Sequence, residues 1–131
     1  MLLQAFRFYL AEKTVAGIGW LHGLKDPQVN VAIEAMHRHP SHKWTLDELA
    51  RLVGLSRSSF ARRFRERVGD TPIAYLARWR MLLATKQLTQ SRQTLAQIAL
   101  SLGYESENAF NTAFKRIMGC APRRYSKLSL R

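Results

Sequence analysis

The sequence predicts an all-α protein with two helix-turn-helix units, which a long central helix joins and a short helical extension precedes. Three observations lead to this fold class. Apolar residues recur at intervals of three and four, and no long stretch alternates as a half-buried strand would. Capping residues, glycines and prolines divide that pattern into short segments. Finally, the succession of a helix, a short turn containing glycine and a second helix occurs twice.

The first 26 residues are expected to form a helical extension and a connector, and residues 27–131 the main domain. A helix at the start of the chain would bury an apolar stripe made of Leu2, Leu3, Phe6 and Leu10. The glycines of "AGIGWLHGLKDP" indicate a connector. Asp26 then caps a helix that begins at Pro27 and stops before Pro40. The buried stripe of that helix is Val29, Ala32, Ile33 and Met36.

The first helix-turn-helix unit is defined by its caps. Thr45, with Glu48 three residues later, predicts a capping box at the start of a helix. Gly54 ends this helix, and Ser56 caps a second helix that ends at Gly69. The apolar stripe of the first helix is Leu46, Leu49, Ala50 and Val53.

A long helix is predicted from Pro72 to about Leu88, and the pattern then repeats. Thr45, Leu46, Leu49, Ala50 and Gly54 recur 49 residues later as Thr94, Leu95, Ile98, Ala99 and Gly103. Phe60, Phe64, Gly69 and Pro72 recur 50 residues later as Phe110, Phe114, Gly119 and Pro122. Because the offset grows by one, the turn of the second unit is expected to hold one extra residue.

Positive charge is concentrated in the repeated part of the chain. The 131 residues carry a formal net charge of +12. Residues 45–131 hold sixteen Lys or Arg against six Asp or Glu, a net of +10. An acidic partner is therefore expected, nucleic acid first and an anionic membrane surface second. No apolar run reaches the roughly 20 residues of a membrane span, and the single cysteine favours a reducing, cytoplasmic setting.

The second helix of each unit is expected to turn a polar face away from the core. At about 100° per residue, Phe60 and Phe64 define the buried side of the first of these helices. The opposite side holds Ser58, Arg62 and Arg65, with Ala61 beside them. In the second unit this side holds Asn108, Thr112 and Lys115, with Asn111 in the place of Ala61.

These polar faces favour contact with duplex DNA, because an α-helix fits the major groove and its outward side chains reach the base edges. Arg62 is the candidate for a guanine, and Asn108 and Asn111 are the candidates for adenines. Thr112 suits the methyl group of a thymine. The candidate phosphate contacts are Arg57, Arg63, Arg65, Arg67, Lys115 and Arg116.

Two plainer interpretations stay open. The arginine-rich helix is also compatible with an ordinary solvated surface, on which Arg62 and Glu66 would form a pair worth about 0.3–0.5 kcal/mol. A basic protein that binds DNA without sequence preference is the second alternative.

From about Trp44 to Tyr125 the chain resembles the DNA-binding domain of the AraC/XylS family of bacterial transcription regulators. The resemblance rests on "LARLVGLSRSSFARRFRERVGDTPIAYLARWRMLLA" and "IALSLGYESENAFNTAFKRIMGCAP". It implies two recognition helices, at about 56–68 and 106–118, in successive major grooves roughly 34 Å apart. The base-contacting positions of the family fall on Ser58, Ala61, Arg62, Glu107, Asn108, Asn111 and Thr112. Glu107 is supplied by the resemblance alone.

The resemblance also implies the partners and the setting. Double-stranded DNA is the expected partner, with RNA polymerase as a candidate protein partner, and no membrane, cofactor or catalysis is expected. Many such regulators carry a sensing domain, often cupin-like, ahead of this domain. Roughly 40 residues are too few for one, so we expect no effector ligand to bind this chain. Residues 1–26 suggest the remnant of such a domain in a fragment or truncated reading frame; a stand-alone regulator is the alternative.

The chain departs from the family pattern at two places. Ser126 follows Tyr125, where the family often has arginine. Ser58 and Ala61 are small for residues that contact bases. The first recognition helix is therefore expected to depend on Arg62, with recognition of DNA shape around it.

Two further groups suggest chemistry but fit it poorly. His37, His39 and His42 in "HRHPSH" lack a neighbouring cysteine or carboxylate and are interrupted by Pro40, so no metal site is predicted. Cys120 would be the methyl acceptor if the chain resembled DNA-repair proteins that contain a similar domain. Those proteins need several cysteines for zinc, and this chain has one.

Overall fold

The computed structural model describes residues 26–90 and 92–129, and these form seven α-helices and no strand. The helices are α2 (Pro27–Arg38), α3 (Leu46–Val53), α4 (Arg57–Val68), α5 (Pro72–Gln90), α6 (Leu95–Ser101), α7 (Glu107–Met118) and α8 (Pro122–Ser129). The predicted all-α fold is confirmed for this part of the chain. The helix and connector expected over residues 1–25 lie outside the described residues.

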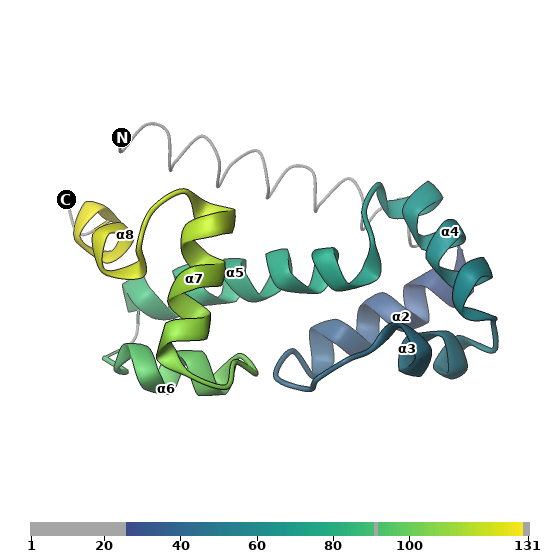
Figure 1. Cartoon of the computed structure of the whole chain (residues 1–131), viewed down its shortest axis with the longest axis horizontal. Coiled ribbons are helices and arrows are strands. Elements are labelled where there is room, and N and C mark those ends of the chain that lie inside the picture. The colour runs from purple at the N-terminus through teal and green to yellow at the C-terminus, as the bar shows by residue number, and fades with distance from the viewer. Residues whose placement is uncertain (1–25, 91, 130–131) are drawn as a thin grey trace.

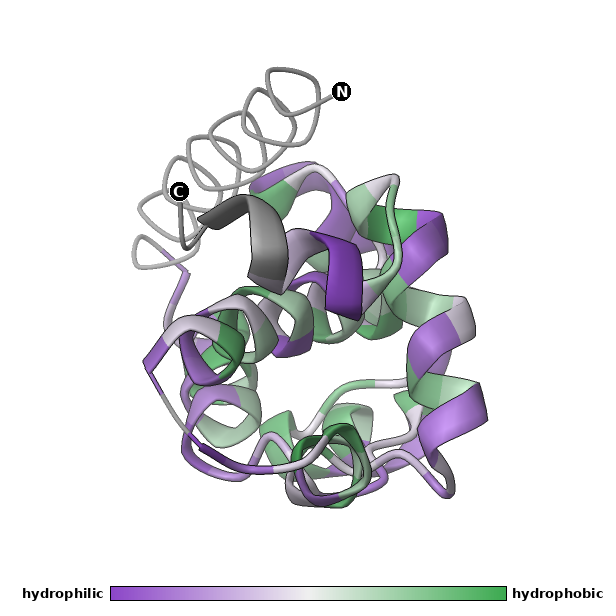
Figure 2. Cartoon of the chain, turned by 90° about the vertical axis from the view of Figure 1, so that its left-hand side faces the viewer, coloured by the Kyte–Doolittle hydropathy of each residue, from purple (hydrophilic) through white to green (hydrophobic). Residues whose placement is uncertain are grey.

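The central helix α5 joins the two units and contributes to a separate hydrophobic core in each. Helices α2, α3 and α4 are grouped at the Pro72 end of α5, where α4 packs on it, and α6, α7 and α8 pack on its other half (Figure 1). Tyr75 and Leu76 are buried in the first core, whereas Met81 and Ala84 are buried in the second. Hydrophobic and hydrophilic residues occupy different sides of the same helices (Figure 2). Each unit therefore folds around its own end of one shared helix.

Both cores contain the same row of three aromatic rings in tilted and edge-on contact. The rings are Phe60, Phe64 and Tyr75 in the first unit and Phe110, Phe114 and Tyr125 in the second. Neighbouring centroids lie 5.8 Å apart in the first row and 5.7 Å apart in the second. The repeat thus extends to Tyr75 and Tyr125, a correspondence that the sequence analysis missed. Next to it, Ser126 Oγ donates to the carbonyl of Leu88 at 3.4 Å, so a serine anchors α8 to α5.

The turn between α3 and α4 and the turn between α6 and α7 begin with a similar backbone conformation and then differ by one residue. Each first helix is followed by a glycine in the left-handed region. Gly54, with φ of 75°, is the C-cap of α3, and Gly103, with φ of 89°, comes directly after Leu102, the C-cap of α6. In both turns the next amide bonds to a carbonyl five residues earlier at 3.0 Å. Ser56 then caps α4 two residues after its glycine, whereas Ser106 caps α7 three residues after its own. The predicted extra residue is confirmed, and it is Glu105.

The capping box predicted at Thr45 is only half formed. Thr45 Oγ1 accepts a hydrogen bond from the Glu48 amide at 3.1 Å. The Glu48 carboxylate contacts His42 Nε2, which lies outside the helix. The complete box occurs in the second unit. There Thr94 Oγ1 accepts from the Gln97 amide at 3.2 Å, and the Gln97 side chain accepts from the Thr94 amide at 2.9 Å.

A buried carboxylate fixes α4 against α2. Asp26 Oδ1 caps α2 by accepting from the amides of Gln28 and Val29, at 3.1 and 3.3 Å. Its Oδ2 lies 2.7 Å from Arg63 Nε on α4, and the Asp26 side chain is only 2% exposed. Gln28 bonds to Arg63 and also donates to the carbonyl of Val53 at 2.8 Å. We call Asp26, Gln28 and Arg63 the Asp26 cluster; it connects α2, α3 and α4.

A histidine connects the end of α2 to α5. His37 Nε2 lies 2.8 Å from the Tyr75 hydroxyl, and its ring stacks on Trp79 with centroids 3.9 Å apart. Burial lowers the pKa of His37 below 6.5, although Glu34 nearby acts in the opposite direction. Burial also raises the pKa of Tyr75 to about 12. The neutral form of His37 is therefore the one that the folded state favours.

We predict that Asp26→Ala lowers the free energy of unfolding by about 1–3 kcal/mol, because it removes both the α2 cap and the partner of Arg63. Urea denaturation followed by circular dichroism measures this loss. The matched control is Asp47→Ala. Asp47 lies 3.1 Å from Arg57 Nε, but its side chain is 50% exposed, so we expect a loss of only about 0.2–1 kcal/mol. Equal losses in the two variants would contradict the role given to Asp26.

We also predict that the stability contributed by His37 is complete above about pH 6.5 and decreases as the pH falls below it. The unfolded chain binds the proton at the ordinary pKa of 6.5, whereas the folded chain binds it only at lower pH. His37→Phe keeps an aromatic ring against Trp79 but cannot be protonated. Urea denaturation from pH 7.5 to pH 5 should therefore give a shallower loss of stability in the variant. If the free energy of unfolding decreases equally with falling pH in both proteins, His37 is ruled out as a source of the pH dependence.

Candidate nucleic-acid interface

The first candidate recognition helix, α4, has the orientation that the sequence predicts. Ser56 Oγ caps it by accepting from the Ser59 amide at 3.2 Å. Its buried residues are Phe60, Phe64 and Val68. On the other side, Ser58, Arg62 and Arg65 are exposed and Ala61 is half-buried. The small side chains at Ser58 and Ala61 leave the Arg62 guanidinium as the longest group on this part of the face.

The second candidate recognition helix, α7, repeats this arrangement with different chemistry. Ser106 Oγ accepts from the Ala109 amide at 3.0 Å. The polar face contains exposed Asn108, Thr112, Lys115 and Arg116, with Glu107 and Asn111 half-buried. The Thr112 hydroxyl donates to the carbonyl of Asn108 at 3.0 Å. This bond occupies the hydroxyl within the helix, so the methyl group is the part of Thr112 that suits an outside contact.

The five arginines of α4 differ in their partners. Arg63 Nε lies 2.7 Å from the buried Asp26 carboxylate, and Arg67 Nε lies 3.7 Å from the same oxygen. Arg57 Nε lies 3.1 Å from Asp47 on α3, where both side chains are well exposed. Arg62 and Arg65 form no ion pair with any residue in the described part of the chain. They are the two cations of α4 that have no ion-pair partner among the described residues.

Arg63 is the arginine whose surroundings differ most from the sequence-based expectation. A phosphate contact was predicted for it, yet its guanidinium already faces Asp26 and Gln28. Its side chain is 41% exposed, so part of the group reaches solvent. The phosphate contact stays a prediction, and the internal contact adds a positioning role.

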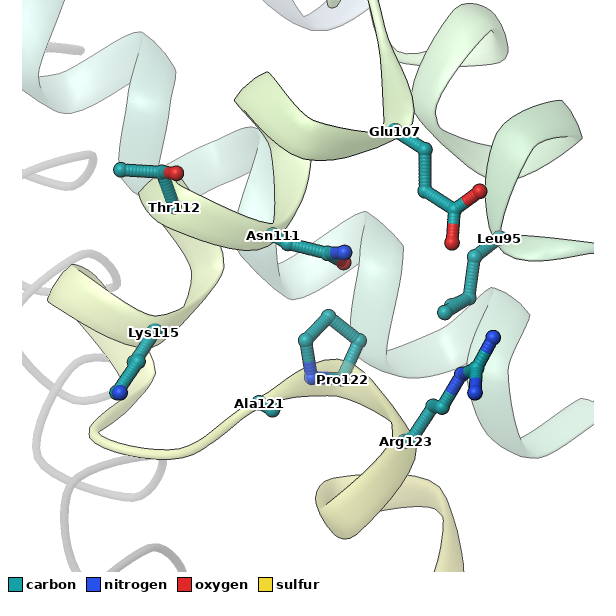
Figure 3. A pocket seen from close by; sticks show the side chains of 8 residues that line it. All are labelled: Leu95, Glu107, Asn111, Thr112, Lys115, Ala121, Pro122 and Arg123. Carbon is teal, nitrogen blue, oxygen red and sulfur yellow. The ribbon is translucent and has the colours of Figure 1, made fainter.

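A pocket of about 390 Å³ borders the polar face of α7. It lies between the start of α6, the outer side of α7 and the start of α8, and its lining is Leu95, Glu107, Asn111, Thr112, Lys115, Ala121, Pro122 and Arg123 (Figure 3). Asn111 points from α7 toward Pro122, and its Oδ1 is buried without a hydrogen-bond partner. Three of the predicted base-contacting residues therefore line the same pocket: Glu107, Asn111 and Thr112.

Arg123 is a candidate residue that the sequence analysis missed. It is exposed at the start of α8 and lines the same pocket as Lys115. The signal was present in the repeat, because Pro122 and Pro72 are equivalent helix starts. The residue after Pro72 is Ile73, which is uncharged, so comparison of the two units did not suggest a cation at this point.

The alternative chemistries find little support among the described residues. Cys120 is 9% exposed, and burial raises the pKa of its thiol, which lowers the fraction of reactive thiolate. His37 contacts Tyr75 and His42 contacts Glu48. Over residues 26–90 and 92–129, no three His, Cys, Asp or Glu residues gather closely enough to hold a metal ion. Within the same ranges, no helix has the length and apolar character needed to cross a membrane.

Known proteins share this sequence and fold. A family profile described as a helix-turn-helix domain matches residues 49–128. An AraC-like transcription regulator from Streptomyces lividans is 46% identical over 127 residues, which are 97% of this chain and 42% of that protein. The chain thus spans less than half the length of this relative.

Two solved structures have the same arrangement of helices. The C-terminal domain of AraT, a response regulator from Geobacillus stearothermophilus, matches with a TM-score of 0.75 and 29% identity over 78% of this chain and 85% of that chain. The DNA-binding domain of AdpA, solved in complex with a target DNA, matches with a TM-score of 0.72 and 28% identity over 78% of this chain and 91% of that chain.

The family match extends from within α3 through α4, α5, α6 and α7 to most of α8. These matches agree with the resemblance that the two sequence signatures carry. The chain therefore belongs to the AraC/XylS family, whose members are DNA-binding transcription regulators and not enzymes.

Proposed function

We propose that this chain binds double-stranded DNA sequence-specifically and thereby regulates transcription, with α4 and α7 in successive major grooves. The observation that carries the proposal is the structural repeat: two capped helices of equal length each bury a phenylalanine pair and expose a polar face. The net charge of +10 over residues 45–131 supports an anionic partner. The complex of the AdpA domain with a target DNA supports DNA as that partner.

The two recognition helices make different contacts with DNA in this proposal. On α4, Arg62 contacts a guanine, and the small Ser58 and Ala61 allow the helix to approach the bases closely. Arg65 contacts a phosphate, since it has no internal ion pair among the described residues. Arg57, Arg63 and Arg67 are the other proposed phosphate contacts, and each would exchange part of an internal ion pair for a phosphate.

On α7 the proposed base contacts are two amides, a methyl group and a carboxylate. Asn108 and Asn111 contact adenines, and Thr112 contacts a thymine methyl. Glu107 suits the amino group of a cytosine. Lys115, Arg116 and the additional Arg123 contact phosphates, which places cations around the pocket on α7. Because α7 itself is nearly neutral, it contributes more to sequence preference than to attraction.

The other partners that we propose, RNA polymerase and an effector ligand, are inferred from longer regulators of the family. We infer a cytoplasmic setting from the proposed binding to DNA, and RNA polymerase is the protein partner that a transcription regulator of this kind would contact. The relative from Streptomyces lividans has more than half of its length outside the match. We assign an effector ligand, where one exists, to such an additional region and not to this domain.

We predict that the chain selects a two-part consensus from a pool of random duplexes. The two half-sites should lie about 10–10.5 base pairs apart from centre to centre, which is one helical turn. Sequencing of the bound fraction after several rounds of selection measures this. A bound fraction without consensus would favour the alternative of non-specific binding by a basic protein.

We further predict that Arg62→Ala weakens binding by about 1–3 kcal/mol, and only for duplexes that carry one particular guanine. Arg65→Ala is the matched control, because it removes the same group from the same exposed face. It should weaken binding to all duplexes alike and reduce the slope of log affinity against log salt by about one. Titrations of matched and mutated duplexes by fluorescence anisotropy measure both effects. A uniform loss in Arg62→Ala would identify Arg62 as a phosphate contact.

A further inference from the structure

The two units also contact each other directly, beside α5. The loop after α2, residues 40–43, lies against the turn of the second unit, residues 103–105, and the Arg80 side chain of α5 contacts both. Arg80 Nε donates to the carbonyl of Pro40 at 2.7 Å, and its Nη2 donates to the carbonyl of His42 at 2.8 Å. The guanidinium carbon lies 5.6 Å from the centroid of the Tyr104 ring. One side chain therefore contacts both units.

The backbones of the loop and the turn are also in close contact. A Cβ atom on Gly103 would lie 2.5 Å from the carbonyl oxygen of Ser41. At the equivalent Gly54, a Cβ atom would meet no atom of the described residues within 4 Å. Two separate features therefore require a glycine at position 103: its φ of 89° and the close approach of the Ser41 backbone. In addition, Lys43 Nζ lies 3.0 Å from Glu105 Oε1, and Glu105 is the extra residue of the second turn.

These contacts involve parts of the chain that hold the recognition helices. Residues 40–43 lead into α3, which packs on α4, and residues 103–105 lead directly into α7. The two hydrophobic cores share no residue. Within residues 26–90 and 92–129, these contacts supplement α5 in setting the relative orientation of α4 and α7.

We propose that this inter-unit contact, made by residues 40–43, Arg80 and residues 103–105, fixes the angle between α4 and α7 and so determines which half-site spacing the domain accepts. Arg80 is the central positioning residue. Its contacts are with the loop and the turn, and it acts through them. The inference rests on the proposed function, because a spacing preference requires two half-sites.

The first test varies the spacing in duplexes that carry the selected consensus. Insertion of one base pair rotates one half-site by about 34° relative to the other. We expect this insertion to weaken binding of the unmodified chain by at least about tenfold, and binding of Arg80→Met by less than about threefold. Lys86→Met is the matched control, because it removes one charge from an exposed position of the same helix. In Lys86→Met, the insertion should weaken binding as much as it does in the unmodified chain.

Arg80→Lys covers the case in which Arg80→Met does not fold. A lysine retains the charge but cannot donate to two carbonyls in the fixed geometry of a guanidinium. We expect the insertion to weaken binding of Arg80→Lys by a factor between those of the unmodified chain and Arg80→Met. The circular dichroism spectrum of Arg80→Lys should match that of the unmodified chain, which would show that the variant folds. A spacing penalty that is unchanged in both folded Arg80 variants would overturn the proposal.

The second test needs no DNA. Spin labels at Glu66→Cys on α4 and Ala109→Cys on α7, in a Cys120→Ala background, report the distance between the two helices in the full chain. We expect one narrow distance distribution with Arg80 present, a broader one with Arg80→Met, and no change with Lys86→Met. An equally narrow distribution in Arg80→Met would overturn the proposed role in orientation. If selection yields no consensus, the proposed function and the spacing role both fail, and the distance distributions still decide whether Arg80 orients the helices.

Discussion

The burial of two phenylalanine pairs is the interaction on which the rest of the structure depends. Phe60 and Phe64, like Phe110 and Phe114, are fully buried and lie four residues apart on their helices. Each fully buried aromatic side chain contributes about 1.5–3 kcal/mol of transfer free energy, which exceeds any single surface contact on the same helix. The pairs therefore decide how α4 and α7 are rotated. The polar faces of both helices point outward as a consequence.

The helix boundaries could be predicted because their signals are local. Asp26, Ser56 and Gly54 act on amides or backbone angles within a few residues, and the repeat added a second copy of the same signals. Contacts between distant residues could not be predicted. Arg63 lies 37 positions after Asp26, so their pairing depends on how α2 and α4 pack. The approach of Gly103 to Ser41 likewise depends on the placement of whole units.

The formal charge of α4 overstates the number of its cations that are available to an anion. Five arginines against one glutamate suggest a strongly cationic surface. Three of them have carboxylate partners, and the partner of Arg63 is almost entirely buried. A bound phosphate would have to compete with those carboxylates, most strongly at Arg63. Charge counting cannot separate a cation that holds the fold together from one that is available for binding.

The separation of the two hydrophobic cores along α5 has a consequence for protein engineering. The first core includes Leu76 and the second begins with Met81, so the four residues between them form a natural crossover point. Segments on either side can be exchanged with those of a relative while every buried neighbour stays within its own segment. Arg80, Gly103 and the Lys43–Glu105 pair are exceptions, because their contacts extend across the junction. Under the proposed function, a chimaera that keeps these residues would combine the half-site preferences of two regulators in one chain.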